Sequence, residues 1–101
     1  MSIPQDVKSI YLIMGHSGEF GDYETWPVCT YWKEEPAKEH ARLAHIAAEK
    51  IYMRQMDMET YHYEPVHVQT EWDDRCYVDY TGTDYKVQKI KLYEKIVRSD
   101  S

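Results

Sequence analysis

One stretch of this sequence has the periodicity of an amphipathic helix, and it limits the choice of fold more than any other feature. From Ala37 to about Met53, apolar residues recur at helical spacing. Glu34, Glu35 and Pro36 precede this run, and acidic residues with an early proline suit the first turn of a helix. The apolar stripe comprises Ala37, Ala41, Ala44, Ala48 and Ile51, widened by Leu43 and Ala47. A stripe of such small residues predicts a helix that lies close against a sheet.

The segments before this helix alternate as strands do. Residues 9–14 carry apolar side chains on both faces, which predicts a central strand covered on one side by a helix. Residues 25–32 read as a second strand, in which Pro27 lacks an N–H group and favours a late start or an edge position. Residues 15–22 between them are rich in glycine and predict a turn.

The segments after the helix are more varied. Residues 66–72 alternate as a strand, residues 73–74 suit an exposed turn, and residues 76–80 form either a hairpin partner or an ordered loop. The last strand is expected at about residues 85–93, with a bulge near Gln88 and Lys89 where its apolar parity slips. The resulting expectation is an α+β fold: a small antiparallel sheet with a β-β-α-β core and an extra hairpin, packed against one amphipathic helix. The order of the strands stays open.

The charge of the chain is concentrated in one stretch. With 101 residues, the chain suits a single domain over residues 1–101 with a modest core. Its net charge of −6 argues against a general nucleic-acid binder, since phosphate contacts need clustered Lys and Arg. Residues 57–84 form an acidic insertion, with eight acidic residues against Arg75 alone. The same insertion contains Tyr61, Tyr63, Trp72, Tyr77 and Tyr80.

No local motif of cysteines and histidines predicts a catalytic or metal site, and the alternative is a metal site that the fold assembles from His16 or His62 and distant carboxylates. Cys29 and Cys76 are far apart and outside any Cys-x-x-Cys motif, so we expect two reduced thiols that behave as small apolar residues. A catalytic cysteine would need a histidine brought to it by the fold. The pairs His62 with His67 and His40 with His45 have spacings that place their rings on different faces of a strand or a helix. No cofactor is expected.

The glycine-rich segment Gly15–Asp22 invites comparison with a phosphate-binding loop. It follows a strand, but it has no lysine in the position of a P-loop and leads into a strand instead of a helix. Glu19 and Asp22 would also repel phosphate. The segment is therefore interpreted as a connection between two antiparallel strands. The alternative is a small enzyme or ligand-binding domain centred on this loop, with a pocket around His16, Glu19 and Asp22.

Two motifs at the ends of the chain resemble a known group of proteins. The first is IYLIMGHSGEFGDYETW, a Tyr-Leu strand followed by Gly-x-x-Gly-Glu-aromatic-x-Asp and a second strand that contains Trp26. The second is DYTGTDY, residues 79–85, before a strand of Val, Ile and Leu. Together with the helix, these regions resemble small uncharacterised phage and prophage proteins over about two-thirds of the chain, and residues 57–76 do not match. The resemblance implies a compact β-β-α-β domain of viral or mobile-element origin, and no activity.

The acidic insertion is the candidate functional surface. Tyrosine and tryptophan are enriched at binding hot spots, and carboxylates steer a basic partner. We expect a non-enzymatic phage protein in the cytoplasm of the host cell that binds and inhibits a host protein with a basic nucleic-acid-binding surface, in concrete form an anti-CRISPR or anti-restriction protein. Direct contact with nucleic acid or a membrane is not expected. The predicted partner-binding residues are Tyr61, Tyr63, Glu64, Glu71, Trp72, Asp73 and Asp74, with Asp79 and Asp84 as second-tier charges.

Two apolar residues fall on the polar side of the predicted helix. Ile46 and Met53 lie near the face opposite the alanine stripe, beside charged residues. Scattered exposed apolar residues are common on protein surfaces. Ile46 and Met53 also suit a homodimer contact, and a homo-oligomeric structural protein is therefore a further alternative.

Overall fold

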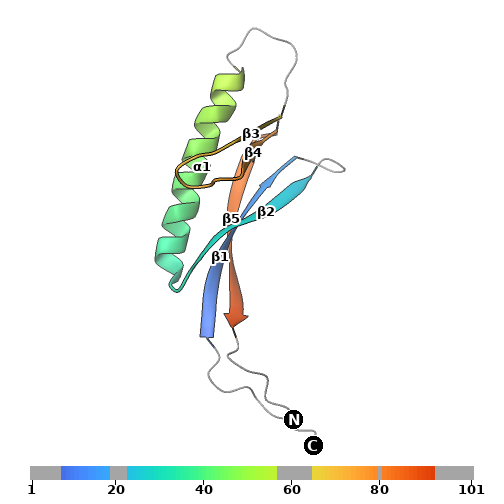
Figure 1. Ribbon diagram of the computed structural model, residues 1–101. Coiled ribbons are helices and arrows are strands. Elements are labelled where there is room, and N and C mark those ends of the chain that lie inside the picture. The colour runs from blue at the N-terminus through green and yellow to red at the C-terminus, as the bar shows by residue number, and fades with distance from the viewer. Residues whose placement is uncertain (1–7, 19–22, 57–64, 80, 93–101) are drawn as a thin grey trace, which may run out of the picture.

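The computed structural model describes residues 8–18, 23–56, 65–79 and 81–92. Its elements follow the order β-β-α-β-β-β, which confirms an α+β fold with one helix and a small antiparallel sheet (Figure 1). The elements are β1 (Lys8–Ser17), β2 (Glu24–Tyr31), α1 (Glu34–Met56), β3 (Val66–Val68), β4 (Cys76–Val78) and β5 (Thr83–Leu92). Within these residues, no helix combines the length and the apolar character that crossing a membrane requires.

The main sheet has three strands in the order β2-β1-β5, with both pairs antiparallel. The prediction that the first strand is central is therefore confirmed. β1 and β5 pair without interruption from Lys8 with Leu92 to Ser17 with Thr83, so the bulge expected near Gln88 and Lys89 was wrong.

The irregularity of the sheet lies instead between β1 and β2. Ile13 pairs with Cys29, whereas the next residue, Met14, pairs with Pro27, so Val28 is the extra residue of β2. Proline cannot donate a ladder hydrogen bond, and proline in a sheet is therefore found at edges and bulges. β2 is both an edge strand and the bulged strand, which agrees with this rule.

Helix α1 has the predicted acidic first turn and ends at Met56, beyond the predicted end near Met53. It begins at Glu34, where Glu34 and Glu35 place negative charge in the first turn, and Lys38 Nζ lies 2.7 Å from Glu34 Oε1. The alanines 37, 41, 44 and 48 of the stripe are buried as predicted, with exposed fractions between 0 and 8 %, whereas Leu43, Ala47 and Ile51 are half-buried. Ala37 and Ala41 pack against Ile13 of β1. The small side chains bring the axis of α1 close to the sheet.

A second, two-stranded sheet resolves the open question about residues 66–80. β3 and β4 pair as an antiparallel hairpin, from Val66 with Val78 to Val68 with Cys76. The strand predicted over residues 66–72 is shorter because Thr70 N donates to Asp73 O at 2.9 Å, which closes a turn. Residues 69–75 form the β3–β4 loop.

Helix α1 and the hairpin cover the same face of the main sheet (Figure 1). Cys76 and Val78 of β4 pack against Ala48 of α1, and Tyr85 of β5 contacts both this group and the cluster around Ile13. Since side chains alternate along a strand, the opposite face of β1 carries Ile10, Leu12 and Met14, turned away from α1. The sheet therefore has one face covered by two elements and one that neither of them covers.

Candidate functional site

A buried carboxylate joins the β3–β4 loop to the sheet. Asp73 is 2 % exposed. Its Oδ2 accepts hydrogen bonds from Trp26 Nε1 at 2.8 Å and from the Tyr85 hydroxyl at 2.7 Å, and its Oδ1 accepts one from the backbone N–H of Arg75 at 3.0 Å. Buried polar groups persist when they are hydrogen-bonded, and here three donors compensate for burial. The expectation that Asp73 lies in an exposed turn was wrong.

The phenol of Tyr85 is the second member of this network. Its hydroxyl also lies 3.4 Å from the sulfur of Cys76, which is fully buried. Burial raises the pKa of Tyr85 well above its usual range, and the hydrogen bonds to Cys76 and Asp73 raise it further. The phenol therefore keeps its proton and acts as a donor to Asp73.

His40 of α1 forms a second anchor of the loop. Its Nε2 lies 2.7 Å from the carbonyl oxygen of Trp72, and its Nδ1 lies 2.8 Å from the hydroxyl of Tyr31. A carbonyl oxygen only accepts, so Nε2 carries the proton and donates, and Nδ1 accepts from the tyrosine. The indole of Trp72 also packs edge-on against this imidazole, at 5.3 Å between ring centroids.

The fold brings Cys29 and His40 together, which the sequence could not show. The sulfur of Cys29 lies 3.7 Å from His40 Nε2. An activated nucleophile needs a lowered thiol pKa, but burial raises the pKa of Cys29, and the nearby charge of Asp73 raises it further. Both ring nitrogens of His40 already have oxygen partners. The contact is best described as packing of a protonated thiol against a structural histidine.

The β3–β4 loop presents charge from a fixed backbone. Besides the Thr70 turn, the Asp73 N–H donates to Thr70 Oγ1 at 3.0 Å. Glu71 and Asp74 are exposed, and Trp72 is half-buried. Glu71, Trp72 and Asp74, three of the predicted partner-binding residues, are therefore adjacent on a surface loop. The buried carboxylate of Asp73 anchors this loop to the sheet.

Asp79 belongs to a second buried junction. It is 2 % exposed, and its N–H donates to Ser17 Oγ at 3.0 Å. The Ser17 hydroxyl donates in turn to Gly82 O at 2.7 Å, and Gly82 N donates to Asp79 O at 2.8 Å. Gly82 has φ +86°, which glycine adopts without strain. Asp79 therefore fixes the entry to β5 and is not part of an outer surface, contrary to the expected second-tier role.

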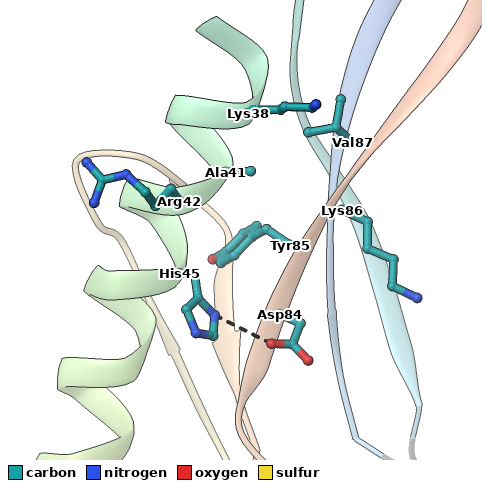
Figure 2. Close-up of a pocket in the computed structure, with 8 residues that line it drawn as sticks. All are labelled: Lys38, Ala41, Arg42, His45, Asp84, Tyr85, Lys86 and Val87. Carbon is teal, nitrogen blue, oxygen red and sulfur yellow. Dashed lines mark ion pairs between the residues drawn. The ribbon is translucent and has the colours of Figure 1, made fainter. Parts of the chain in front are cut away.

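Asp84 is exposed but lies apart from the loop, at a groove between α1 and β5 (Figure 2). Its Oδ1 lies 3.4 Å from His45 Nδ1. The groove has a volume of about 590 Å³, and Figure 2 shows the Tyr85 ring directed toward the helix within it. It is lined by Lys38, Ala41, Arg42 and His45 of α1 and by Asp84, Tyr85, Lys86 and Val87 of β5.

The predicted acidic surface is therefore divided. Glu71, Trp72 and Asp74 are brought together, Asp73 and Asp79 are inside the protein, and Asp84 lines the groove at α1. Tyr61, Tyr63 and Glu64 lie outside the described residues. The polar residues that sequence reasoning missed are Trp26, Tyr31, His40 and Tyr85, whose only sequence signal is that polar-tipped aromatic residues occupy the core-facing side of predicted elements.

The glycine-rich segment proves to be partly strand. Gly15, His16 and Ser17 belong to β1, while Glu19 and Asp22 lie outside the described residues. A Cβ on Gly15 would meet the Trp26 ring at 2.5 Å, so glycine at this position makes room for the indole. The Nε2 atom of His16 is buried and has no hydrogen-bond partner among the residues that the structure describes, and burial lowers the pKa of the ring. Over residues 8–18, 23–56, 65–79 and 81–92, no three His, Cys, Asp or Glu side chains are grouped to hold a metal ion.

The outer face of α1 has the predicted apolar residues. Met53 is 54 % exposed, and Ile46 is half-buried. Both line a shallow hollow of about 520 Å³ with Glu49, Lys50 and Arg54. Their role in a homodimer stays a prediction.

Comparison with known proteins adds no relative. No family model, no curated protein and no solved structure matches this chain. The functional argument therefore rests on the residues themselves.

Proposed function

We propose that this is a non-enzymatic phage or mobile-element protein that binds and inhibits a host protein, and that the β3–β4 loop is its contact site. The observation that carries the proposal is the way the loop is held: the Asp73 carboxylate is buried under it, while Glu71 and Asp74 are exposed on it. The resemblance of both ends of the chain to small phage proteins supports the origin.

The fixed backbone is what makes the loop a good contact site. A flexible loop loses conformational entropy when it binds, whereas a loop already held in place loses less. Here His40 of α1 donates to the Trp72 carbonyl, and Thr70 within the loop accepts from the Asp73 N–H. Two exposed carboxylates beside a half-buried Trp72 also combine electrostatic steering with an amphipathic ring.

The chemistry of the loop favours a partner with a basic surface. Nucleic-acid-handling proteins use clustered Lys and Arg to bind phosphate, and carboxylates from a rigid loop compete for the same side chains. Inhibition by occupation of that surface is the mode expected of an anti-CRISPR or anti-restriction protein. In this proposal the host protein is bound in the host cytoplasm.

The test compares two charge-reversal variants of equal net charge. Glu71→Lys with Asp74→Lys alters the loop, and Glu24→Lys with Glu49→Lys alters exposed acids on β2 and α1. Asp73 is left intact because a buried lysine there would disrupt the fold. Capture of a host protein from lysate on the immobilised chain should be lost with the loop variant and retained with the control, and a short DNA duplex should release the captured protein.

Circular dichroism and thermal unfolding establish that both variants are folded. Unchanged capture by the loop variant would refute the site, and equal loss with both variants would show that only net charge matters. Release that a duplex does not promote would refute a nucleic-acid-handling partner while leaving the loop as the contact.

A further inference from the structure

The outer edge of β5 has no strand beside it in the part of the chain that the structure describes. β1 pairs with the inner edge of β5 along its whole length, and the order β2-β1-β5 places β5 at the side of the sheet. At one end, His45 Nδ1 lies 3.2 Å from the carbonyl oxygen of Thr83. Backbone N–H and C=O groups of successive residues point to opposite edges of a strand, so every second residue shares an edge. The residues whose N–H and C=O share the edge of the Thr83 carbonyl are Tyr85, Val87, Lys89 and Lys91.

The groove of about 590 Å³ runs beside this edge (Figure 2). One wall is α1, through Lys38 and Ala41, and the other is β5, through Tyr85 and Val87. An extended chain laid along β5 would pair with its backbone and send alternate side chains toward α1. From Gln88 to Leu92 the strand is exposed, so the edge continues beyond the groove.

The charges that β5 itself contributes along this edge are mainly positive, three lysines against Asp84. Five cations, Lys38, Arg42, Lys86, Lys89 and Lys91, lie on the two walls or farther along β5. Four carboxylates accompany them, Asp84, Glu34, Glu35 and Glu39, of which Glu34 and Glu39 pair with Lys38 and Arg42. In the described part of the chain, Lys86, Lys89 and Lys91 form no direct ion pair, although the charge of Lys89 helps to lower the pKa of Glu34.

Lysines on an edge strand also select among the strands that pair with it. Pairing of two β5 edges would bring Lys86, Lys89 and Lys91 of one copy beside those of another, and like charges on adjacent strands are destabilising. An acidic strand meets the same lysines as opposite charges. The apolar side chains of Ile90 and Leu92, 37 and 38 % exposed, add contacts that a peptide uses and a phosphate backbone does not.

We propose that the free edge of β5 and its groove bind an extended acidic segment of another protein by β-strand addition. This site takes a ligand of opposite charge to the partner proposed for the β3–β4 loop, and it shares no residue with that loop.

The probe is a synthetic ten-residue peptide of alternating valine and glutamate, titrated into the full-length protein. Backbone amide shifts in NMR spectra should change from Tyr85 to Lys91, and affinity should fall with added salt. Lys89→Glu with Lys91→Glu should weaken binding by about tenfold or more, because each reversal replaces an attraction by a repulsion. The matched control, Lys33→Glu with Lys50→Glu, should leave the affinity within about twofold.

Two further peptides separate strand addition from simple charge attraction. An N-methylated version, which keeps the charges but loses alternate N–H groups, should bind at least about tenfold more weakly. A peptide of alternating valine and lysine should not bind.

Equal affinity for the N-methylated peptide, or shifts outside β5 and α1, would overturn the proposal. Self-association of the chain at this edge, or displacement of the same amide signals by duplex DNA without any by the acidic peptide, would also overturn it. The loop variant with Glu71→Lys and Asp74→Lys should bind this peptide normally, so failure here and failure of the proposed function are separate results.

Discussion

The Asp73 carboxylate accepts hydrogen bonds from an indole, a phenol and a backbone amide. Asp73→Ala leaves Trp26 Nε1 and the Tyr85 hydroxyl buried without an acceptor, and we expect a loss of about 3 kcal/mol in the free energy of unfolding. Urea denaturation measures it. Asp74→Ala, at the exposed neighbour, should change the same quantity by less than about 0.5 kcal/mol. Equal losses in the two variants would contradict the assigned network.

Gly15 offers a second prediction at the residue scale. A Cβ there would lie 2.5 Å from the Trp26 ring, so Gly15→Ala should destabilise the protein by about 1–3 kcal/mol through overpacking. In a Trp26→Leu background the added methyl group has more room, and the same substitution should cost less. A double-mutant cycle measures this coupling. Additive effects would mean that the strain arises elsewhere.

His16 predicts a pH dependence. Burial lowers the pKa of its ring, Asp84 opposes this and Lys86 adds to it. The unfolded chain therefore binds the proton more readily than the folded protein, and the free energy of unfolding should fall as the pH drops below about 6.5. In urea titrations at several pH values, His16→Gln should reduce this fall, whereas His67→Gln, on the exposed side of β3, should not. An unchanged slope in His16→Gln would assign the effect to other groups.

At the scale of elements, the distance between α1 and its neighbours depends on alanine. Ala48 is fully buried against Cys76 and Val78, and Ala48→Leu should cost about 1–3 kcal/mol because no space exists for the larger side chain. Ala47, half-buried one residue earlier, is the matched control, and Ala47→Leu should cost clearly less. Thermal unfolding monitored by circular dichroism compares the two. A tolerated Ala48→Leu would mean that the hairpin packs loosely on α1.

The elements show why the sequence predicted some parts and not others. The span of α1 and the central place of β1 follow from periodicity within each segment, so they were predictable. The burial of Asp73 depends on Trp26 and Tyr85, 47 and 12 residues away, and no local pattern records those contacts. The bulge was misplaced because alternation marked a slip in β5, whereas Pro27 set the irregularity in β2. No local pattern distinguishes the exposed Glu71 and Asp74 from the buried Asp73 and Asp79 either. Only the fold shows which of these carboxylates reach the surface.

At the scale of the whole molecule, Tyr85 joins two packing clusters. It contacts the group around Ile13 and the group around Cys76, so the helix, the sheet and the hairpin share one side chain. We expect a single cooperative unfolding transition, in which the calorimetric and van't Hoff enthalpies agree. Tyr85→Ala should broaden that transition and make the van't Hoff enthalpy the smaller of the two. A van't Hoff enthalpy well below the calorimetric value in the unmodified protein would contradict this coupling.

The Trp26 indole has a consequence for how assembly of the protein can be observed in time. Its ring is 8 % exposed, its N–H meets a carboxylate of the β3–β4 loop, and its edge contacts Tyr77 and Tyr85. With Trp32→Phe and Trp72→Phe, it would be the single fluorophore of its kind in the chain. Its fluorescence emission would then report the docking of the hairpin in real time, because it shifts to longer wavelength when the hairpin separates from the sheet and water reaches the ring.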